Sequence, residues 1–531
     1  MRRLLTPGRA AFVTVLVFGL TATTASAAPS PASVTPSPRA PAPSPTEPAP
    51  SPGSPGIGDP YYPDYGNGGY DVGHYDLRLR YWPATDRFAG TATILATATQ
   101  NLSRFDLDFV LAVTSVRVDN RPAGFWTAGA HELVVQPARD LAMGATFTVV
   151  VQYADVPSRV RRDGTSLWRR TADGALAVDE PNIAWWWFPS NDHPLDKATF
   201  DVSVMVPDGT QVISNGRQPS GPTPVLLGWT RWYWREIRPQ ATYLAFLAIG
   251  KYDLRTDSAA DGTPVITAYS TALGDLASAA RASVERTSEI IEWESHLLGP
   301  YPFEAEGGVV VPANTLGFAL EAQTKPVYDG AFWRRASNEY VVVHENAHQW
   351  FGDSVSVAGW RNIWLNEGFA RYLEWLWSQA HGEGTASELF AYAYALHPAT
   401  DGFWQVKPGD PGPSRLFDPA VYDRGGMAVH ALRLAVGDTA FFRILRSWAA
   451  QRRYGNGTIE QFEALADQVS GRDLHEMFTR WLFTPGRPAL PPGVRSARTA
   501  VAGAGARAAG GVPPSPPRPA SWASIEHADV P

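Results

Sequence analysis

The sequence predicts a multidomain α+β protein, with an antiparallel β-rich N-terminal domain followed by a mainly helical domain. Between residues 75 and 249, apolar residues alternate or form short β-branched runs separated by Gly, Pro and Asp turn signals. After about residue 254 the apolar period shifts toward 3.6 residues, the period of an α-helix. The 531 residues are 44% hydrophobic, which is enough for more than one core.

The start of the chain predicts export. Arg2 and Arg3 precede an apolar run of about 13 residues, and Ala25 and Ala27 supply the small residues that a signal peptidase reads. We therefore expect a signal peptide over residues 1–27, a secreted extracellular protein, and no stable membrane span after cleavage. The alternative is an uncleaved anchor, but the run is shorter than the roughly 20 residues that span a bilayer.

Two segments are predicted to be disordered. Residues 28–60 form a Pro/Ser-rich linker, because Pro-rich sequence cannot form a regular backbone hydrogen-bond ladder. Residues 487–531 are rich in Ala, Gly and Pro without periodicity, which predicts a disordered tail. The folded domains then span residues 61–254 and 255–486.

The elements expected within these domains follow from the two periods. Strand patterns include residues 75–81, 147–153 and 200–206. Helical patterns cover residues 277–298, 336–351, 364–379 and 424–434.

Composition excludes several classes of function. The net charge of −7 disfavours a nucleic-acid-binding protein, which needs a concentrated basic face. The absence of cysteine excludes disulfides, thiolate catalysis and iron–sulfur clusters.

The centre of the helical region carries a metal-binding pattern. In HENAH, His344 and His348 lie one helical turn apart on the same face, so both imidazoles can reach one ion. Glu345 projects toward the open side of that ion, where it can take a proton from water. Alone, the pattern also arises by chance in about one in a hundred chains of this length.

A third ligand follows on the next predicted helix. Glu367 lies in the sequence WLNEGFA, with 18 residues between it and His348. Two imidazoles and one carboxylate leave the fourth tetrahedral position for water, as in a catalytic rather than a structural zinc site. Donors without sulfur suit one Zn²⁺ per chain, for which Mn²⁺ or Co²⁺ can substitute. The alternative for Glu367 is a solvated carboxylate on a helix surface.

These motifs resemble those of the zinc aminopeptidases related to aminopeptidase N and leukotriene hydrolase. The resemblance covers residues 70–486 and includes FPSNDHP at 188–194, where the family has FPCFDEP, followed by Lys197 and Ala198. It implies a β-rich domain packed on a thermolysin-like, mainly helical zinc catalytic domain. It also implies peptide substrates with a free N-terminus. We expect a monomer that binds no nucleic acid.

The resemblance also implies how the substrate amine is bound. Glu321 lies in FALEA at 318–322, where the family has GAMEN, and Glu180 aligns with the second amine-binding glutamate. A carboxylate there binds an N-terminal ammonium and sets the register of an exopeptidase. Val178 replaces the glutamine usual two positions before Glu180. The alternatives are a solvated strand residue for Glu321 and an exposed loop carboxylate for Glu180.

Tyr422, in the sequence YDRG, resembles the catalytic tyrosine of the family, whose hydroxyl donates to the oxyanion. A tyrosine that only packs in the core is the alternative. The larger family members continue into a helical domain that covers the site. Here only the low-complexity tail follows, so we expect a more open cleft.

Two features stay undecided from the sequence. Thermolysin-like sites place an Asp four residues after the ligand Glu, but this chain has Arg371 there, and Asp353 and Glu374 are candidates on spacing alone. The triple tryptophan at 185–187 either lines a subsite or, as is commoner, packs in the core.

The function predicted from these residues is that of a secreted zinc aminopeptidase with Glu345 as general base. Three alternatives remain. A thermolysin-like endopeptidase would use the same zinc without needing a free N-terminus, and a non-catalytic binding protein could retain the fold. An epoxide hydrolase is less favoured, because the fatty-acid pocket in that branch of the family depends on the missing domain.

Overall fold

The structure is a computed structural model that describes residues 48–162, 164–491 and 516–528, and from Ala49 onward they belong to one compact unit. The predicted signal peptide over 1–27 lies outside the described residues. So do residues 28–47 of the predicted linker.

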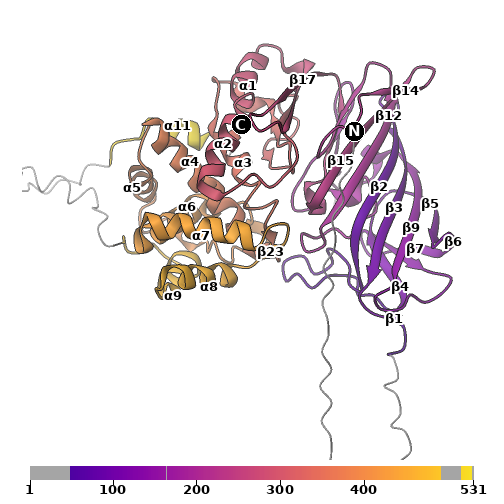
Figure 1. Cartoon of the computed structure of the whole chain (residues 1–531), viewed down its shortest axis with the longest axis horizontal. Coiled ribbons are helices and arrows are strands. Elements are labelled where there is room, and N and C mark those ends of the chain that lie inside the picture. Colours follow the sequence, from indigo (N-terminus) through magenta and orange to yellow (C-terminus); the bar gives the residue numbers. More distant parts are fainter. Residues whose placement is uncertain (1–47, 163, 492–515, 529–531) are drawn as a thin grey trace, which may run out of the picture. The chain divides into compact units, whose positions relative to one another are not determined.

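An eight-stranded sheet dominates the N-terminal half (Figure 1). Its order is β14-β15-β12-β2-β3-β9-β5-β6. Side chains of β12 alternate between buried and half-buried along the whole strand, as expected for a sheet with one face on a core. The strands are β14 (Thr223–Leu226), β15 (Trp229–Gln240), β12 (Ala198–Pro207), β2 (Tyr70–Trp82), β3 (Arg87–Ala98), β9 (Thr146–Asp155), β5 (Val113–Val118) and β6 (Arg121–Pro122).

The three predicted strand segments fall within β2, β9 and β12, so the β-rich N-terminal half is confirmed. Within the eight-stranded sheet one pairing differs from the antiparallel expectation, because β12 runs parallel to β2. A parallel pair needs a long crossover connection, and more than 100 residues separate these two strands.

Two four-stranded sheets complete this half. One has the order β1-β4-β8-β7 and the other β10-β11-β16-β13. Their strands are β1 (Ser51–Pro52), β4 (Leu102–Asp108), β8 (Glu132–Gln136), β7 (Gly124–Ala128), β10 (Trp168–Arg170), β11 (Ala175–Ala177), β16 (Leu247–Gly250) and β13 (Gln211–Ile213). The tryptophans at 185–187 are buried in the core of this half, which supports the packing interpretation.

The C-terminal half begins with a five-stranded sheet of order β17-β18-β19-β21-β20. Its strands are β17 (Tyr252–Ser258), β18 (Pro264–Ser270), β19 (Glu306–Val311), β21 (Val327–Asp329) and β20 (Ala319–Leu320), and β22 (Ser356–Val357) pairs separately with β23 (Asn456–Gly457). The short strand β20 lies at the sheet edge, which leaves one side of its backbone unpaired by the sheet. The predicted domain boundary at 254/255 falls inside β17.

Helices form the rest of the C-terminal half, which confirms its mainly helical class (Figure 1). They are α1 (Leu276–Val284), α2 (Thr287–Leu298), α3 (Tyr340–Ala347), α4 (Trp364–His381), α5 (Ala386–Leu396), α6 (Pro419–Val436), α7 (Asp438–Gln451), α8 (Ile459–Ser470), α9 (His475–Phe478) and α11 (Trp522–Glu526).

Local side-chain chemistry explains where these helices differ from the predicted ones. The helix predicted over 277–298 is divided into α1 and α2, where the Thr287 hydroxyl bonds to the carbonyl of Val284 at 2.7 Å and competes with the helical backbone. Helix α6 begins five residues before the predicted start. Asp418 caps its N-terminus by accepting from the amide of Ala420, and Pro419 occupies the first turn.

His430 lies where α4, α5 and α6 pack together, and it makes stability depend on pH. Its ring is 3.0 Å from the Tyr372 hydroxyl and 3.3 Å from the Ser387 hydroxyl. Burial, with a smaller effect of Arg433, lowers the pKa of His430 from its usual 6.5 to about 3. The unfolded chain therefore binds more protons than the folded chain between these values. This contribution to stability is fully present above pH 6.5 and is lost as the pH falls toward 3.

We expect His430→Gln to flatten the acid limb of the stability profile. Its free energy of unfolding should fall less steeply than that of the wild type between pH 6.5 and 4, by up to about 1.4 kcal/mol per pH unit. Urea unfolding at pH 6.5, 5.5 and 4.5 measures this slope. The exposed His296→Gln should keep the wild-type slope, and equal slopes for His430→Gln and the wild type would contradict the assignment.

The prediction of a disordered linker is wrong for its last residues, 48–60. Strand β1 pairs with β4, and the Asp59 carboxylate is 3.1 Å from His193 Nε2 and accepts from the Trp360 amide at 2.8 Å. Asp59 thus connects this segment to residues of both halves.

The predicted disorder is also wrong for residues 516–528, which include helix α11. Trp522 and Ile525 are buried, and the Trp522 ring packs edge-on against Tyr392 at 5.1 Å. The Ser521 hydroxyl lies 2.7 Å from that of Ser378 on α4. This segment therefore packs on the helical half.

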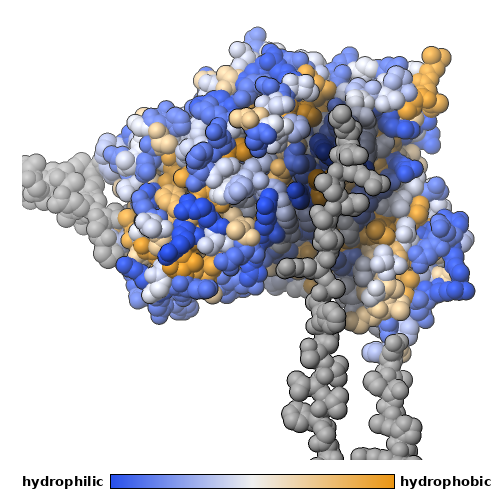
Figure 2. Space-filling model, viewed as in Figure 1, coloured by the Kyte–Doolittle hydropathy of each residue, from blue (hydrophilic) through white to orange (hydrophobic). Residues whose placement is uncertain are grey.

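The visible face is mainly hydrophilic, with scattered hydrophobic patches (Figure 2). Leu226 and Leu227 at the β14–β15 turn are exposed, but isolated apolar side chains are normal on a protein surface. Within the described residues, none of the helices combines the length and hydrophobicity needed to cross a membrane.

Candidate active site

Helices α3 and α4 pack against each other and bring the predicted ligands together. His344 and His348 lie on and just after α3, and Glu367 lies in the first turn of α4. All three are buried, so the alternative of a solvated Glu367 is wrong.

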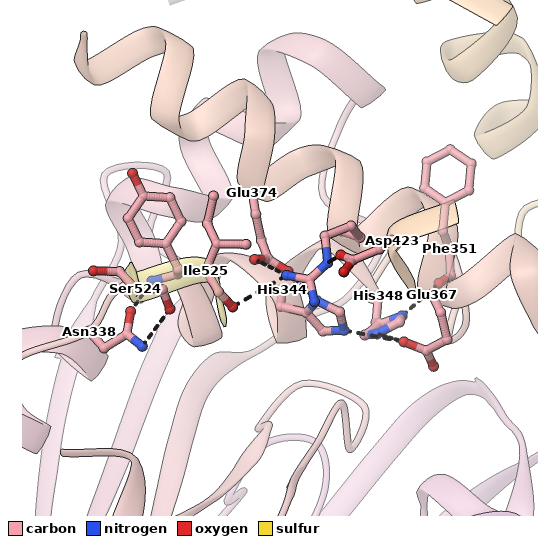
Figure 3. A network of polar contacts seen from close by, with 11 residues as sticks. Asn338, His344, His348, Phe351, Glu367, Glu374, Asp423, Ser524 and Ile525 are labelled. Carbon is pink, nitrogen blue, oxygen red and sulfur yellow. Dashed lines mark hydrogen bonds and ion pairs between the residues drawn. The ribbon is translucent and has the colours of Figure 1, made fainter. Parts of the chain in front are cut away.

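The three side chains converge on one point (Figure 3). The Oε2 atom of Glu367 is 3.2 Å from Nε2 of His344 and 3.5 Å from Nε2 of His348. Each Nδ1 atom is used elsewhere, at 2.6 Å from the Glu374 carboxylate for His344 and 3.0 Å from the Phe351 carbonyl for His348. Both Nε2 atoms therefore face Glu367, as metal-binding imidazoles require.

The electrostatics of this cluster favour a cation. Burial raises the pKa of Glu367, but His348 and His344 lower it more, to about 2. Burial lowers the pKa of His348, but Glu367 and Glu321 raise it more, to about 10. The carboxylates therefore stabilise positive charge at this point, and a metal ion can supply that charge in place of protons.

Glu374 is the outer partner of the first histidine, one of the two candidates that spacing alone left undecided. The guanidinium of Arg371 donates to the same carboxylate at 2.7 Å and lies 3.1 Å from Asp423, the neighbour of Tyr422. The carbonyl of Ile525 on α11 also accepts from Arg371 at 3.4 Å. Arg371 thus connects Glu374, the partner of His344, to α6 and to the C-terminal segment. No metal-binding pattern includes an arginine, so the sequence carries no signal for this role.

We expect Glu374→Gln to lower zinc affinity by about 10–100-fold, because the neutral amide orients His344 less firmly and makes it a weaker donor. Competition with a fluorescent zinc chelator measures the change. The exposed Glu292→Gln on α2 is the matched control and should bind zinc like the wild type. An unchanged dissociation constant for Glu374→Gln would show that the contact does not tune the metal site.

Glu345 faces the same space as the ligands. One of its oxygens lies within 4.8 Å of donor atoms of Glu321 and His348. Burial raises the pKa of Glu345 to about 8, partly offset by His344 and His348. A carboxylate with a raised pKa at this place is a suitable proton acceptor and donor.

Glu321 directly follows the edge strand β20, and its carboxylate accepts from the Tyr243 hydroxyl at 3.0 Å. It is 3% exposed, so the alternative of a solvated strand residue is wrong. Glu180 is half-buried, and its Oε1 atom has no hydrogen-bond partner among the described residues. Burial, and then the charge of Glu321, raises the pKa of Glu180. The two carboxylates therefore lie close enough to repel each other.

Tyr422 lies on α6, with its ring stacked near that of His344 at 5.9 Å and 27°. It is half-buried and lines the cavity described next, so part of its side chain faces the site.

All seven predicted site residues line one cavity of about 380 Å³. Lysine and arginine are absent from its lining among the described residues, whereas five carboxylate side chains line it. Apolar walls come from Phe318, Phe417, Pro419 and Ala528. Ala528 belongs to the C-terminal segment, so that segment contributes to the wall of a cleft predicted to be open.

Comparisons with known proteins agree with this geometry. Residues 72–244 match the Peptidase M1 N-terminal domain, and residues 285–481 match the Peptidase family M1 domain. The crystal structure of the M1 zinc metallopeptidase from Deinococcus radiodurans is 30% identical, with a TM-score of 0.73, over 83% of this chain and 99% of that one. The chain belongs to peptidase family M1. A Glu-to-Ala mutant of the Deinococcus M1 zinc metallopeptidase, crystallised with a Tyr-Ser-Ala substrate, is 28% identical, with a TM-score of 0.72, over 83% of this chain and 100% of that one.

Two curated M1 relatives are longer. Aminopeptidase N of Lactococcus lactis subsp. lactis is 26% identical over 454 residues, which cover 78% of this chain and 51% of the relative. Aminopeptidase M1-B of Oryza sativa subsp. japonica is 25% identical over 452 residues, covering 78% and 50%. The chain thus spans about half the length of these relatives.

Membership of the M1 family implies one catalytic Zn²⁺, and the residues present fit it. Two buried imidazole Nε2 atoms and one buried carboxylate oxygen converge without sulfur, which is a donor set typical of a catalytic zinc site. The residues that would hold the ion in this M1 peptidase are His344, His348 and Glu367.

Proposed function

We propose that this M1 peptidase is a zinc-dependent aminopeptidase that hydrolyses the first peptide bond of substrates with a free N-terminus. The observation that carries the proposal is the pair of carboxylates, Glu321 and Glu180, in the same cavity as the zinc ligands. A buried acid and a half-buried acid, without a lysine or arginine in the described lining, form a site for a positively charged group. An N-terminal ammonium provides that charge and can bond to both.

Glu321 and Glu180 would fix the register of the substrate. With its ammonium held between them, the first peptide bond lies near the histidine ligands, and the side chain of the first residue meets the apolar wall. A substrate without this charge leaves both acids without a cationic partner, which costs binding free energy.

Bound zinc supplies a Lewis acid that polarises the scissile carbonyl and makes water more acidic. Glu345 then takes the proton of the attacking water and returns it to the leaving amine. The hydroxyl of Tyr422 donates to the oxyanion that develops on the carbonyl. The raised pKa of Glu345 suits this exchange, because the same group must both accept and release a proton.

A ten-residue peptide with a free amine, compared with its N-acetylated twin, tests the proposal. Mass spectrometry should show stepwise loss of residues from the free N-terminus and no cleavage of the twin. Internal cleavage of both peptides would instead favour a thermolysin-like endopeptidase, and cleavage of neither would favour a binding protein.

We also propose that the protein is exported and acts outside the cell as a monomer. Support for export comes from Arg2 and Arg3, the short apolar run and the small residues at Ala25 and Ala27. N-terminal sequencing of protein from the culture medium should begin near residue 28. Retention of the intact chain in the membrane fraction would contradict cleavage and favour an anchor.

A further inference from the structure

A second group of side chains that could hold a metal ion lies in the N-terminal half, away from the M1 site. Antiparallel pairing of β4 and β8 places Asp108 opposite Glu132, and His131 directly precedes β8. The Nε2 atom of His131 is 3.3 Å from Oδ1 of Asp108 and 3.6 Å from Oε1 of Glu132. Their side chains are 0–8% exposed, so this is not a solvated acidic surface.

Several oxygens of this cluster lack a hydrogen bond within the described parts of the chain. They are Oδ1 of Asp108 and both carboxylate oxygens of Glu132. The other oxygen of Asp108 is satisfied by the Asn67 amide at 3.1 Å and the Asp192 backbone at 2.7 Å. Buried carboxylate oxygens without partners are costly, so each such group requires an explanation.

A basic side chain does not provide that explanation. Among the described residues, no lysine or arginine forms an ion pair with Asp108 or Glu132, and His131 is the single basic group in contact. The cluster therefore has an excess of negative charge that requires either a bound proton or a bound cation.

The spacing of the donor atoms fits a bound cation. The distances of 3.3 and 3.6 Å nearly equal the 3.2 and 3.5 Å between the donors of the M1 site. The backbone carbonyl of Asp64 accepts a hydrogen bond from His131 Nε2 at 2.9 Å and places a further oxygen at the cluster. A cation bound at Nε2 would take the place of that proton. We propose that Asp108, His131 and Glu132 bind a second divalent cation. One nitrogen donor among oxygens suits Zn²⁺ or Mn²⁺ better than Ca²⁺.

The position of the cluster gives this cation a structural role. The cluster joins β4 and β8 to residues 64–67, which belong to the segment that precedes β2. In that segment the Tyr65 hydroxyl accepts from Asn182 at 2.6 Å, two residues after Glu180. The cation would therefore stabilise the segment against which the Glu180 loop rests, while the reacting groups lie elsewhere.

Metal content tests the proposal without reference to activity. The untagged full chain is dialysed with Zn²⁺ or Mn²⁺, freed of excess ion, and analysed by inductively coupled plasma mass spectrometry. We expect about two ions per wild-type chain and one in His348→Ala, which disrupts the M1 site. One ion in the wild type, and none in His348→Ala, would overturn the proposal.

Variants of the cluster locate the second ion. Glu132→Gln, or Asp108→Asn if the first does not fold, should hold one ion and unfold at a lower temperature than the wild type. The matched control is Glu236→Gln, another buried carboxylate of the N-terminal half, which should keep two. If Glu132→Gln and Asp108→Asn both keep two ions, the second site lies elsewhere and the proposal is wrong.

Discussion

Glu345→Gln is expected to lower kcat by about 10²–10⁴-fold while the zinc content stays at the wild-type level. Glutamine keeps the size of the side chain but cannot accept the proton of the attacking water. The ligands His344, His348 and Glu367 are untouched, so metal binding should survive. Steady-state kinetics with an aminoacyl-aminomethylcoumarin, together with metal analysis of the same sample, measure both quantities.

Glu339→Gln is the matched control for this variant. Glu339 directly precedes the same helix α3 but pairs with Arg286 at 3.1 Å, outside the cavity. Its replacement should change kcat less than about threefold, because losing one partly exposed ion pair costs little. Near-wild-type turnover in Glu345→Gln would show that another group takes the proton.

His348→Ala is expected to abolish measurable activity by releasing the metal. Removal of one of three protein ligands should weaken zinc binding by more than the roughly 100-fold that loss of an outer partner costs. Competition with a zinc chelator gives the dissociation constant, and added zinc at high concentration should restore little turnover.

A control separates loss of the ligand from loss of a histidine. His296→Ala, on the exposed face of α2, should bind zinc and turn over substrate as the wild type does. Circular dichroism of His348→Ala should still show a folded chain, because the surrounding helices have their own apolar core. Wild-type zinc affinity in His348→Ala would remove this residue from the ligand set.

The convergence of His344, His348 and Glu367 could be predicted because its geometry is local. Two histidines four residues apart share a helix face whatever the rest of the fold does. The prediction of Glu367 as the third member required only a second helix nearby, which the NEGFA sequence indicates. Amphipathic periodicity likewise predicted α4 to within two residues at its C-terminal end, where Gly382 adopts the left-handed conformation.

The partners of those ligands could not be predicted, because they depend on how helices pack. Which carboxylate reaches Nδ1 of His344 is decided by the rotation of α4 against α3, and spacing alone left Glu374 and Asp353 equivalent. The cluster of Asp108, His131 and Glu132 shows the same limit. Its members are brought together by the strand register of β4 and β8, which no sequence motif reports.

Composition misled at both ends of the chain. Proline-rich sequence before residue 60 and Ala/Gly-rich sequence after 487 indicated disorder, yet Asp59 and Trp522 are buried. A single buried carboxylate or a Trp522–Ile525 pair can fix a short segment to a folded surface. Such isolated buried residues change the amino-acid composition of a long window very little.

The central claim is metal-dependent hydrolysis directed by the substrate ammonium. It is tested most directly by comparing alanyl-aminomethylcoumarin with its N-acetylated twin, before chelation, after chelation and after zinc is restored. We predict turnover of the free amine alone, lost with chelator and recovered with zinc. Equal turnover of the acetylated twin, or turnover that survives complete removal of the metal, would contradict the account.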